Sequence, residues 1–94
     1  MAVDFLGTLQ SYGGKFTVKS TQNVNTEGVK SIKVIQSEFG PQMMFTMLNG
    51  RTKYAKLSNQ SALQEGDMVN PESVKLVTLE RDGEIAQRVD GEKL

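Results

Sequence analysis

Residues 42–57 read QMMFTMLNGRTKYAKL. The dipeptide Asn49-Gly50 lies between two runs in which β-prone and apolar residues are frequent. Asn and Gly both accept the positive φ angles of a type I′ turn, so this dipeptide is a strong local signal for a β-hairpin. We therefore predict two antiparallel strands, Gln42–Leu48 and Arg51–Leu57, joined by a two-residue turn.

A two-residue turn would also set the pairing of the two strands. Leu48 would face Arg51, and Phe45 would face Tyr54, with Lys56 further along the same face of the sheet. Two aromatic rings beside a lysine would form a platform for unpaired bases. Stacking of a base on an aromatic ring contributes about 1–3 kcal/mol and tolerates any base.

The same pattern allows a second interpretation, in which the face that contains Phe45 packs the core. The opposite face would then offer Thr46, Arg51 and Lys53 to a phosphate backbone. Exposed aromatic rings would in that case come from elsewhere in the chain: Tyr12, Phe16 or Phe39.

Alternating and turn-forming residues predict three further strands outside this hairpin. Val29–Phe39 alternates and is broken at Gly40-Pro41. A fourth strand enters at Met68-Val69, is interrupted at Asn70-Pro71 and resumes from Val74 to Glu80. The dipeptide Asp82-Gly83 is a second hairpin signal, and a fifth strand, Ile85–Val89, follows it.

The segment between the two hairpins, Ser58–Glu65, has a different pattern. Ser58 or Asn59 can cap a helix at its start, and Gly66 lies where a left-handed C-terminal cap belongs. The segment therefore predicts a helix of about two turns, or a structured loop in its place.

These elements predict an all-β fold with one short helix, in the order β-β-β-α-β-β. This order is typical of a five-stranded Greek-key barrel of the OB type, with an SH3-like or other small barrel as the alternative. A chain of 94 residues makes a single domain. We expect an N-terminal extension over 1–28, the barrel over 29–89 and a short polar tail over 90–94. Within the extension, Lys15–Lys19 alternates like a strand and Ser20–Gly28 is typical of a loop.

The composition excludes several classes of function. The chain has no Cys and no His, which excludes disulfides, zinc fingers and the usual His- or Cys-based catalytic centres. We expect no enzymatic activity, no catalytic residue, no metal and no cofactor. No apolar run approaches the roughly 20 residues of a membrane helix, and Met1–Asp4 does not begin a signal peptide. We expect no membrane association and a cytoplasmic location, in a bacterium or a phage-infected cell.

Charge is balanced overall but unevenly distributed. Eleven basic residues match eleven acidic ones. Residues 27–57 contain five basic and two acidic residues, whereas residues 58–94 contain four basic and eight acidic ones. The positive charge therefore lies on the first three predicted strands, where an OB fold usually binds its ligand.

Three stretches resemble compact OB-fold single-stranded-DNA-binding proteins of phages and plasmids: Ile32–Ile35, Phe45–Tyr54, and Glu65–Asp67 with Val74–Val89. The resemblance implies a replication protein that binds single-stranded DNA, or RNA, without strong sequence preference. The residues that it implies for binding are Lys33, Phe45, Arg51, Lys53, Tyr54 and Lys56. The chain departs from the family in lacking tryptophan and an acidic C-terminal tip.

A protein–protein interaction module is the alternative function. A phage structural adaptor or a small inhibitor of a host enzyme would fit a small barrel with near-zero net charge, since such a charge weakens long-range attraction to nucleic acid. The expected partners are therefore single-stranded nucleic acid, a second copy of the chain in a homo-oligomer, or another protein.

Overall fold

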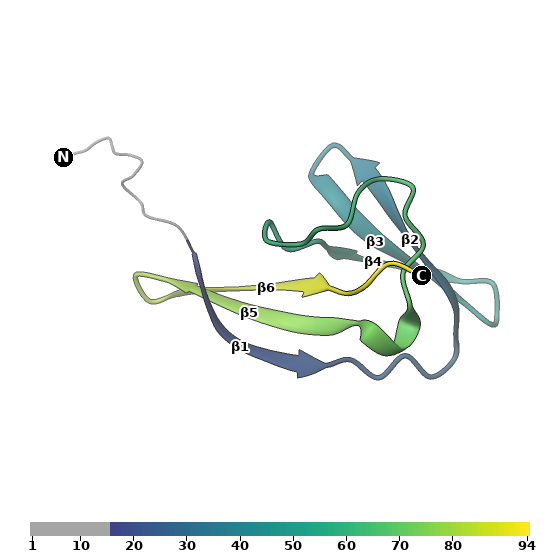
Figure 1. The fold of residues 1–94 in the computed structure, drawn as a ribbon, viewed down its shortest axis with the longest axis horizontal. Coiled ribbons are helices and arrows are strands. Elements are labelled where there is room, and N and C mark those ends of the chain that lie inside the picture. Colours follow the sequence, from purple (N-terminus) through teal and green to yellow (C-terminus); the bar gives the residue numbers. More distant parts are fainter. Residues whose placement is uncertain (1–15) are drawn as a thin grey trace.

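The computed structural model of the protein describes residues 16–94. They form two three-stranded antiparallel sheets, with strand orders β1-β5-β6 and β2-β3-β4 (Figure 1). The elements are β1 Thr17–Asn23, β2 Val29–Ser37, β3 Gly40–Met47, β4 Thr52–Lys56, the 3₁₀ helix η1 Pro71–Ser73, β5 Lys75–Arg81 and β6 Glu84–Asp90.

The predicted all-β class is confirmed, and the described residues contain six strands where five were predicted for the barrel. β1 adds a sixth strand, paired with β5 from Thr17↔Glu80 to Asn23↔Lys75. Residues 20–23, which were expected to be a loop, therefore belong to a strand. The expectations for residues 1–15 lie outside the described residues. The described strands form two three-stranded sheets.

The helix predicted over Ser58–Glu65 is absent, and the structured loop is what forms. Two serine side chains close local turns there: Gln60 N–H donates to Ser58 Oγ, and Leu63 N–H donates to Ser61 Oγ. Short polar side chains that bind nearby N–H groups in this way compete with helix formation. The single helical turn instead follows Asn70, whose side chain accepts a hydrogen bond from Glu72 N–H and caps η1.

The core lies where the two sheets meet. Alternation along β2 directs Ile32 and Val34 inward, and both are fully buried. Met43 of β3 is also fully buried. The remaining buried members of this cluster come from the connecting segments and β6: Leu57, Val69, Val74 and Val89.

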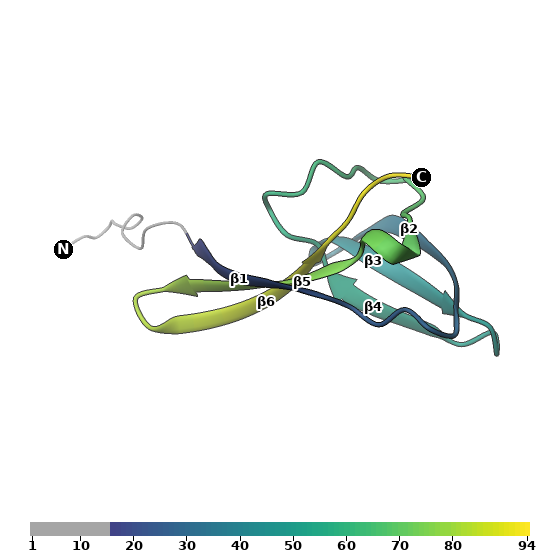
Figure 2. The same cartoon turned by 60° about the horizontal axis from the view of Figure 1, so that its bottom comes forward.

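Backbone hydrogen bonds outside the named strands connect the sheets. Leu57 forms a parallel bridge with Val89, and Ser58 N–H donates to Val89 O over 2.9 Å. The segment 66–69 runs along the free edge of β2, since Val69 N–H donates to Ile32 O. The sheet β1-β5-β6 continues past the region where the two sheets meet and extends away from the core (Figure 2).

The last residues are a paired segment and not the polar tail that was expected. Asn70 N–H donates to Glu92 O, and Leu94 N–H donates to Met68 O, both over 2.9 Å. Residues 92–94 therefore lie beside 68–70, which in turn lie beside β2. Residues 16–94 contain no helix long and apolar enough to cross a membrane.

Candidate nucleic-acid interface

The turn between β3 and β4 decides which side chains share a face. Gly50 N–H donates to Met47 O, and Met47 N–H donates to Arg51 O. Gly50 has a φ of +85°, whereas Asn49 does not have a positive φ. The turn is therefore a three-residue loop, Leu48–Gly50, in which a turn is followed by a left-handed glycine that forms a bulge. The predicted two-residue type I′ turn is wrong.

The longer loop shifts the pairing of β3 and β4 by one residue. Phe45 is opposite Lys53, and Tyr54 is opposite Met44. The predicted pair of Phe45 and Tyr54 is therefore wrong. Because a shift of one residue moves a side chain to the other face, Phe45 lies on the side of Ile32 and packs against the core, whereas Tyr54 lies on the opposite side.

We call this opposite side of sheet β2-β3-β4 the outer face. Its central row is Lys33, Met44 and Tyr54, which are directly opposite one another across the three strands. A row on one side is Ile35, Gln42 and Lys56, and a row on the other side is Ser31, Thr46 and Thr52. Three of the six predicted binding residues thus share this face: Lys33, Tyr54 and Lys56.

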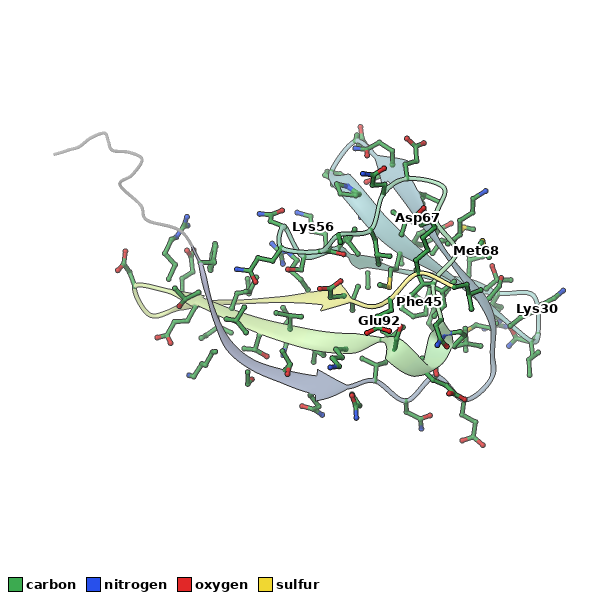
Figure 3. All side chains as sticks on the ribbon, viewed as in Figure 1. Lys30, Phe45, Lys56, Asp67, Met68 and Glu92 are labelled. Carbon is green, nitrogen blue, oxygen red and sulfur yellow. The ribbon has the colours of Figure 1, made fainter. Side chains whose placement is uncertain are left out.

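Exposure and charge make the outer face suitable for a polyanion. Tyr54 is 55% exposed, and Lys33 and Lys56 are exposed beside it. Strands β2, β3 and β4 contain four lysines and no acidic residue. Two of these lysines, Lys30 and Lys56, lie at opposite ends of the sheet (Figure 3).

The other three predicted residues lie elsewhere. Phe45 is half-buried against the core and is not free to stack on a base. Lys53 lies on the core side of β4, where it is exposed at the edge of the sheet. Arg51 is exposed beside the β3–β4 turn. Arg51 and Lys53 therefore border the outer face without being part of it.

Of the three aromatic residues that were named as alternative exposed rings, Phe39 is the one that is exposed within residues 16–94. It is 68% exposed in the turn between β2 and β3. Phe16 is instead covered by the guanidinium of Arg81, whose Cζ lies 4.4 Å from the ring centroid. Tyr12 lies outside the described residues. Tyr54 is therefore the aromatic ring that is exposed within the outer face.

Two residues of this surface were missed by the sequence analysis. Met68 forms a bridge with Lys33, and Leu94 pairs next to Met68, so the central row continues across both. They are 38% and 75% exposed. No local pattern predicts their position, because it depends on pairing between segments that are far apart in the chain.

The acidic residue nearest in sequence to this added edge is already engaged. Asp67 accepts a hydrogen bond from Gln64 N–H over 2.8 Å and lies 3.6 Å from Lys93 Nζ. Its side chain is 19% exposed. Asp67 therefore reduces the positive potential of the outer face less than a free carboxylate would.

No protein-family model, curated protein or solved structure matches the chain. The function is therefore inferred from the geometry and charge of the molecule.

Proposed function

We propose that the protein binds single-stranded nucleic acid, DNA rather than RNA, on the outer face of sheet β2-β3-β4. The observation that supports this most directly is the exposed ring of Tyr54, with Lys33 and Lys56 on the same face and no acidic residue in the three strands. The binding is non-enzymatic and largely independent of sequence, because every base has a face that can stack on an aromatic ring.

In this proposal, the aromatic and basic residues of the outer face and its border have separate roles. A base stacks on Tyr54, and Met44 next to it covers the edge of the base. Neighbouring strands are about 4.8 Å apart, so Lys33 lies two strand spacings from Tyr54 and reaches a different phosphate from the one that Lys56 contacts. Arg51 and Lys53 contact the strand where it leaves the face.

The OB-like resemblance is part of this proposal. The parallel bridge of Leu57 with Val89 and the antiparallel bridge of Val69 with Lys93 link elements of the two sheets around the core. We propose that these links complete an OB-like arrangement, in which β3 and β4, the second and third of the five predicted strands, provide the ligand surface together with β2, as the family would predict.

Fluorescence anisotropy with a labelled dT strand of about 30 nucleotides tests the proposal, with a duplex of similar length as the control. We expect the protein to prefer the single strand. Tyr54→Ala should weaken binding by about 5- to 150-fold, since a base stack contributes about 1–3 kcal/mol. Tyr54→Phe keeps the ring and should bind like the wild type. The absence of binding at low salt, or unchanged affinity in Tyr54→Ala, would overturn the proposal.

The dependence of affinity on salt tests the two lysines. Each phosphate contact on a single strand contributes about −0.7 to the slope of log K against log salt concentration. Lys33→Gln and Lys56→Gln should each make the slope shallower by about that amount. Lys75→Gln, on β5 of the other sheet, makes the same charge change and should leave the slope unchanged. Equal slopes in all three variants would remove Lys33 and Lys56 from the site.

A protein partner is the second candidate for the same face. The exposed side chains of Met68 and Leu94 extend the central row, and apolar side chains that are exposed next to one another favour protein contacts. This function predicts no salt-sensitive binding to single-stranded DNA. The anisotropy experiment therefore distinguishes the two candidates.

A further inference from the structure

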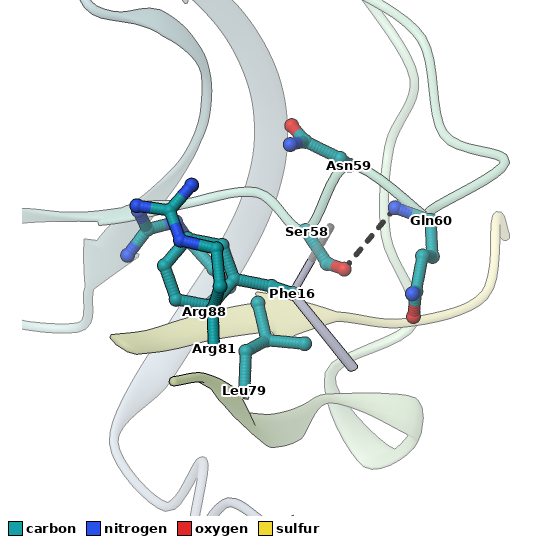
Figure 4. Close-up of a pocket in the computed structure, with 7 residues that line it drawn as sticks. All are labelled: Phe16, Ser58, Asn59, Gln60, Leu79, Arg81 and Arg88. Carbon is teal, nitrogen blue, oxygen red and sulfur yellow. Dashed lines mark hydrogen bonds between the residues drawn. The ribbon is translucent and has the colours of Figure 1, made fainter. Parts of the chain in front are cut away.

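A cavity of about 600 Å³ opens between sheet β1-β5-β6 and the loop that follows β4 (Figure 4). Its lining includes Leu79, Arg81 and Arg88 from the sheet and residues 58–60 from the loop. Its volume lies within the range of about 300–1,000 Å³ that is typical of small-molecule sites. None of the residues assigned to the outer face lines it.

The strand pairing explains why two arginines meet in this cavity. Leu79 and Arg81 are two residues apart on β5 and therefore share a face. Arg88 of β6 is opposite Val77, which places it on the same face and diagonal to Leu79. Along the sheet, the backbone positions of the two arginines thus lie on either side of Leu79, whose side chain is 7% exposed.

The two arginines differ in what they already bind. Arg81 Nη2 lies 2.8 Å from Glu84 Oε1, and its guanidinium covers the ring of Phe16, which also lines the cavity. Arg88 Nη1 donates to Gln87 O over 2.8 Å. Within residues 16–94 no carboxylate lies within ion-pair distance of Arg88. Because a guanidinium has five N–H donors, Arg88 retains donors for an anion.

The opposite wall of the cavity is polar and locally fixed. Ser58 is 4% exposed, and its Oγ accepts a hydrogen bond from Gln60 N–H over 3.2 Å. Asn59 and Gln60, each with a side-chain amide, also line the cavity. The site thus combines an apolar floor at Leu79, a positive side and a wall of amide groups.

We propose that this cavity binds a small ligand in which a phosphate or a carboxylate is attached to a flat apolar body. The anionic group binds Arg88 and Arg81, because the planar guanidinium group matches the geometry of a phosphate or a carboxylate. The apolar body lies on Leu79 beside Phe16, and the amides of Asn59 and Gln60 contact its polar substituents. The cavity is a second site, independent of nucleic-acid binding.

NMR titration of the whole chain tests the proposal with four probes. Phenyl phosphate and benzoate contain both parts of the expected ligand and distinguish a phosphate from a carboxylate. Inorganic phosphate and phenol contain one part each. We expect at least one of the two complete probes to bind more tightly than either part. The amide resonances of Asn59, Gln60 and Arg88 should shift, while those of Lys33 and Tyr54 should not.

Matched variants test the role of the positive side. Arg88→Gln should weaken the better complete probe about tenfold, as expected for the loss of a hydrogen bond to a charged group. Lys75→Gln makes the same charge change on the same sheet, away from the cavity, and should change the affinity by less than about twofold. Arg81→Gln provides the same comparison should Arg88→Gln fail to fold. Equal affinity in the arginine variants and the wild type, or no shift at residues 58–60 and 88 with any probe, would overturn the proposal.

Discussion

The hydroxyl of Ser73 joins two segments that are far apart in the chain. Its Oγ donates to Asn70 O and accepts from Glu92 N–H, each over 2.7 Å. One side chain thus closes the turn of η1 and holds the segment that follows β6. A hydroxyl is suited to this position because it is both a donor and an acceptor.

Ser73→Ala should lower the free energy of unfolding by about 1–2 kcal/mol, because it leaves Glu92 N–H without its partner. Urea denaturation measures the change. Ser20→Ala, at an exposed position of β1, is the control and should change stability by less than about 0.5 kcal/mol. Equal stability of the two variants would mean that water replaces the hydroxyl at no cost.

Gly91 lies next to this contact and leaves room for it. A Cβ at residue 91 would lie 3.0 Å from Val69 Cγ1 and 3.1 Å from Ser73 Oγ. The chain passes here from β6 into the segment beside residues 68–70. A larger side chain would push these segments apart, so the glycine allows a close approach of backbone to core.

The two hairpins show how one residue changes an element. In the β5–β6 hairpin, Asp82 and Gly83 have φ angles of 51° and 84°, and Arg81 is opposite Glu84. This is the two-residue turn that the sequence predicts. In the β3–β4 hairpin, Asn49 Oδ1 accepts a hydrogen bond from Arg51 N–H, and the loop is one residue longer.

Gly50→Ala should destabilise the protein by about 1–2 kcal/mol, because alanine is strained at a φ of +85°. No other atom lies within 4 Å of a Cβ at this position, so the backbone conformation is the whole cause. Gly50→Asn should be milder, since asparagine tolerates this conformation better than alanine. Thermal or urea unfolding of the two variants provides the comparison. A stability of Gly50→Ala equal to that of the wild type would contradict the assigned turn.

These elements show what the sequence could and could not predict. Turn dipeptides located both hairpins, but Asn-Gly is compatible with a two-residue and a three-residue loop, and the loop length decides whether Phe45 and Tyr54 lie on the same face or on opposite faces of the sheet. Three of the six candidate residues consequently share the outer face. The alternation of Lys15–Lys19 indicates the start of β1 but not its extent. Residues 20–23 are polar and exposed, so only their pairing with β5 shows that the strand continues.

At the scale of the molecule, both sheets contribute to the core, but sheet β1-β5-β6 also extends past it (Figure 2). Ile32 and Val34 are fully buried and lie between β3 and the segment 66–69. Within residues 16–94, β1 is hydrogen-bonded to no strand other than β5, and it has no buried side chain. Local stability should therefore be unequal, since it follows buried contacts and protected hydrogen bonds.

Hydrogen exchange followed by NMR should show this difference. We expect the amides of Ile32 and Val34 to exchange at or near the rate of global unfolding. The amides of β1 should exchange at least about tenfold faster. Val77, on the central strand β5 of the same sheet, is the internal reference and should be better protected than β1. Uniform protection across β1 and β2 would show that the whole chain opens as one unit.

The pairing of β1 with β5 also has a consequence for the order in which the chain folds. Thr17 and Glu80 are 63 residues apart, whereas β2, β3 and β4 pair with their neighbours in sequence. At a synthesis rate of about 5–20 residues per second, roughly 3–13 s pass between the emergence of Thr17 and that of its partner Glu80. During this interval β2, β3 and β4 can already assemble, because closing short loops costs less entropy than closing long ones. Of the six described strands, β1 is thus the first to be made and among the last to be paired.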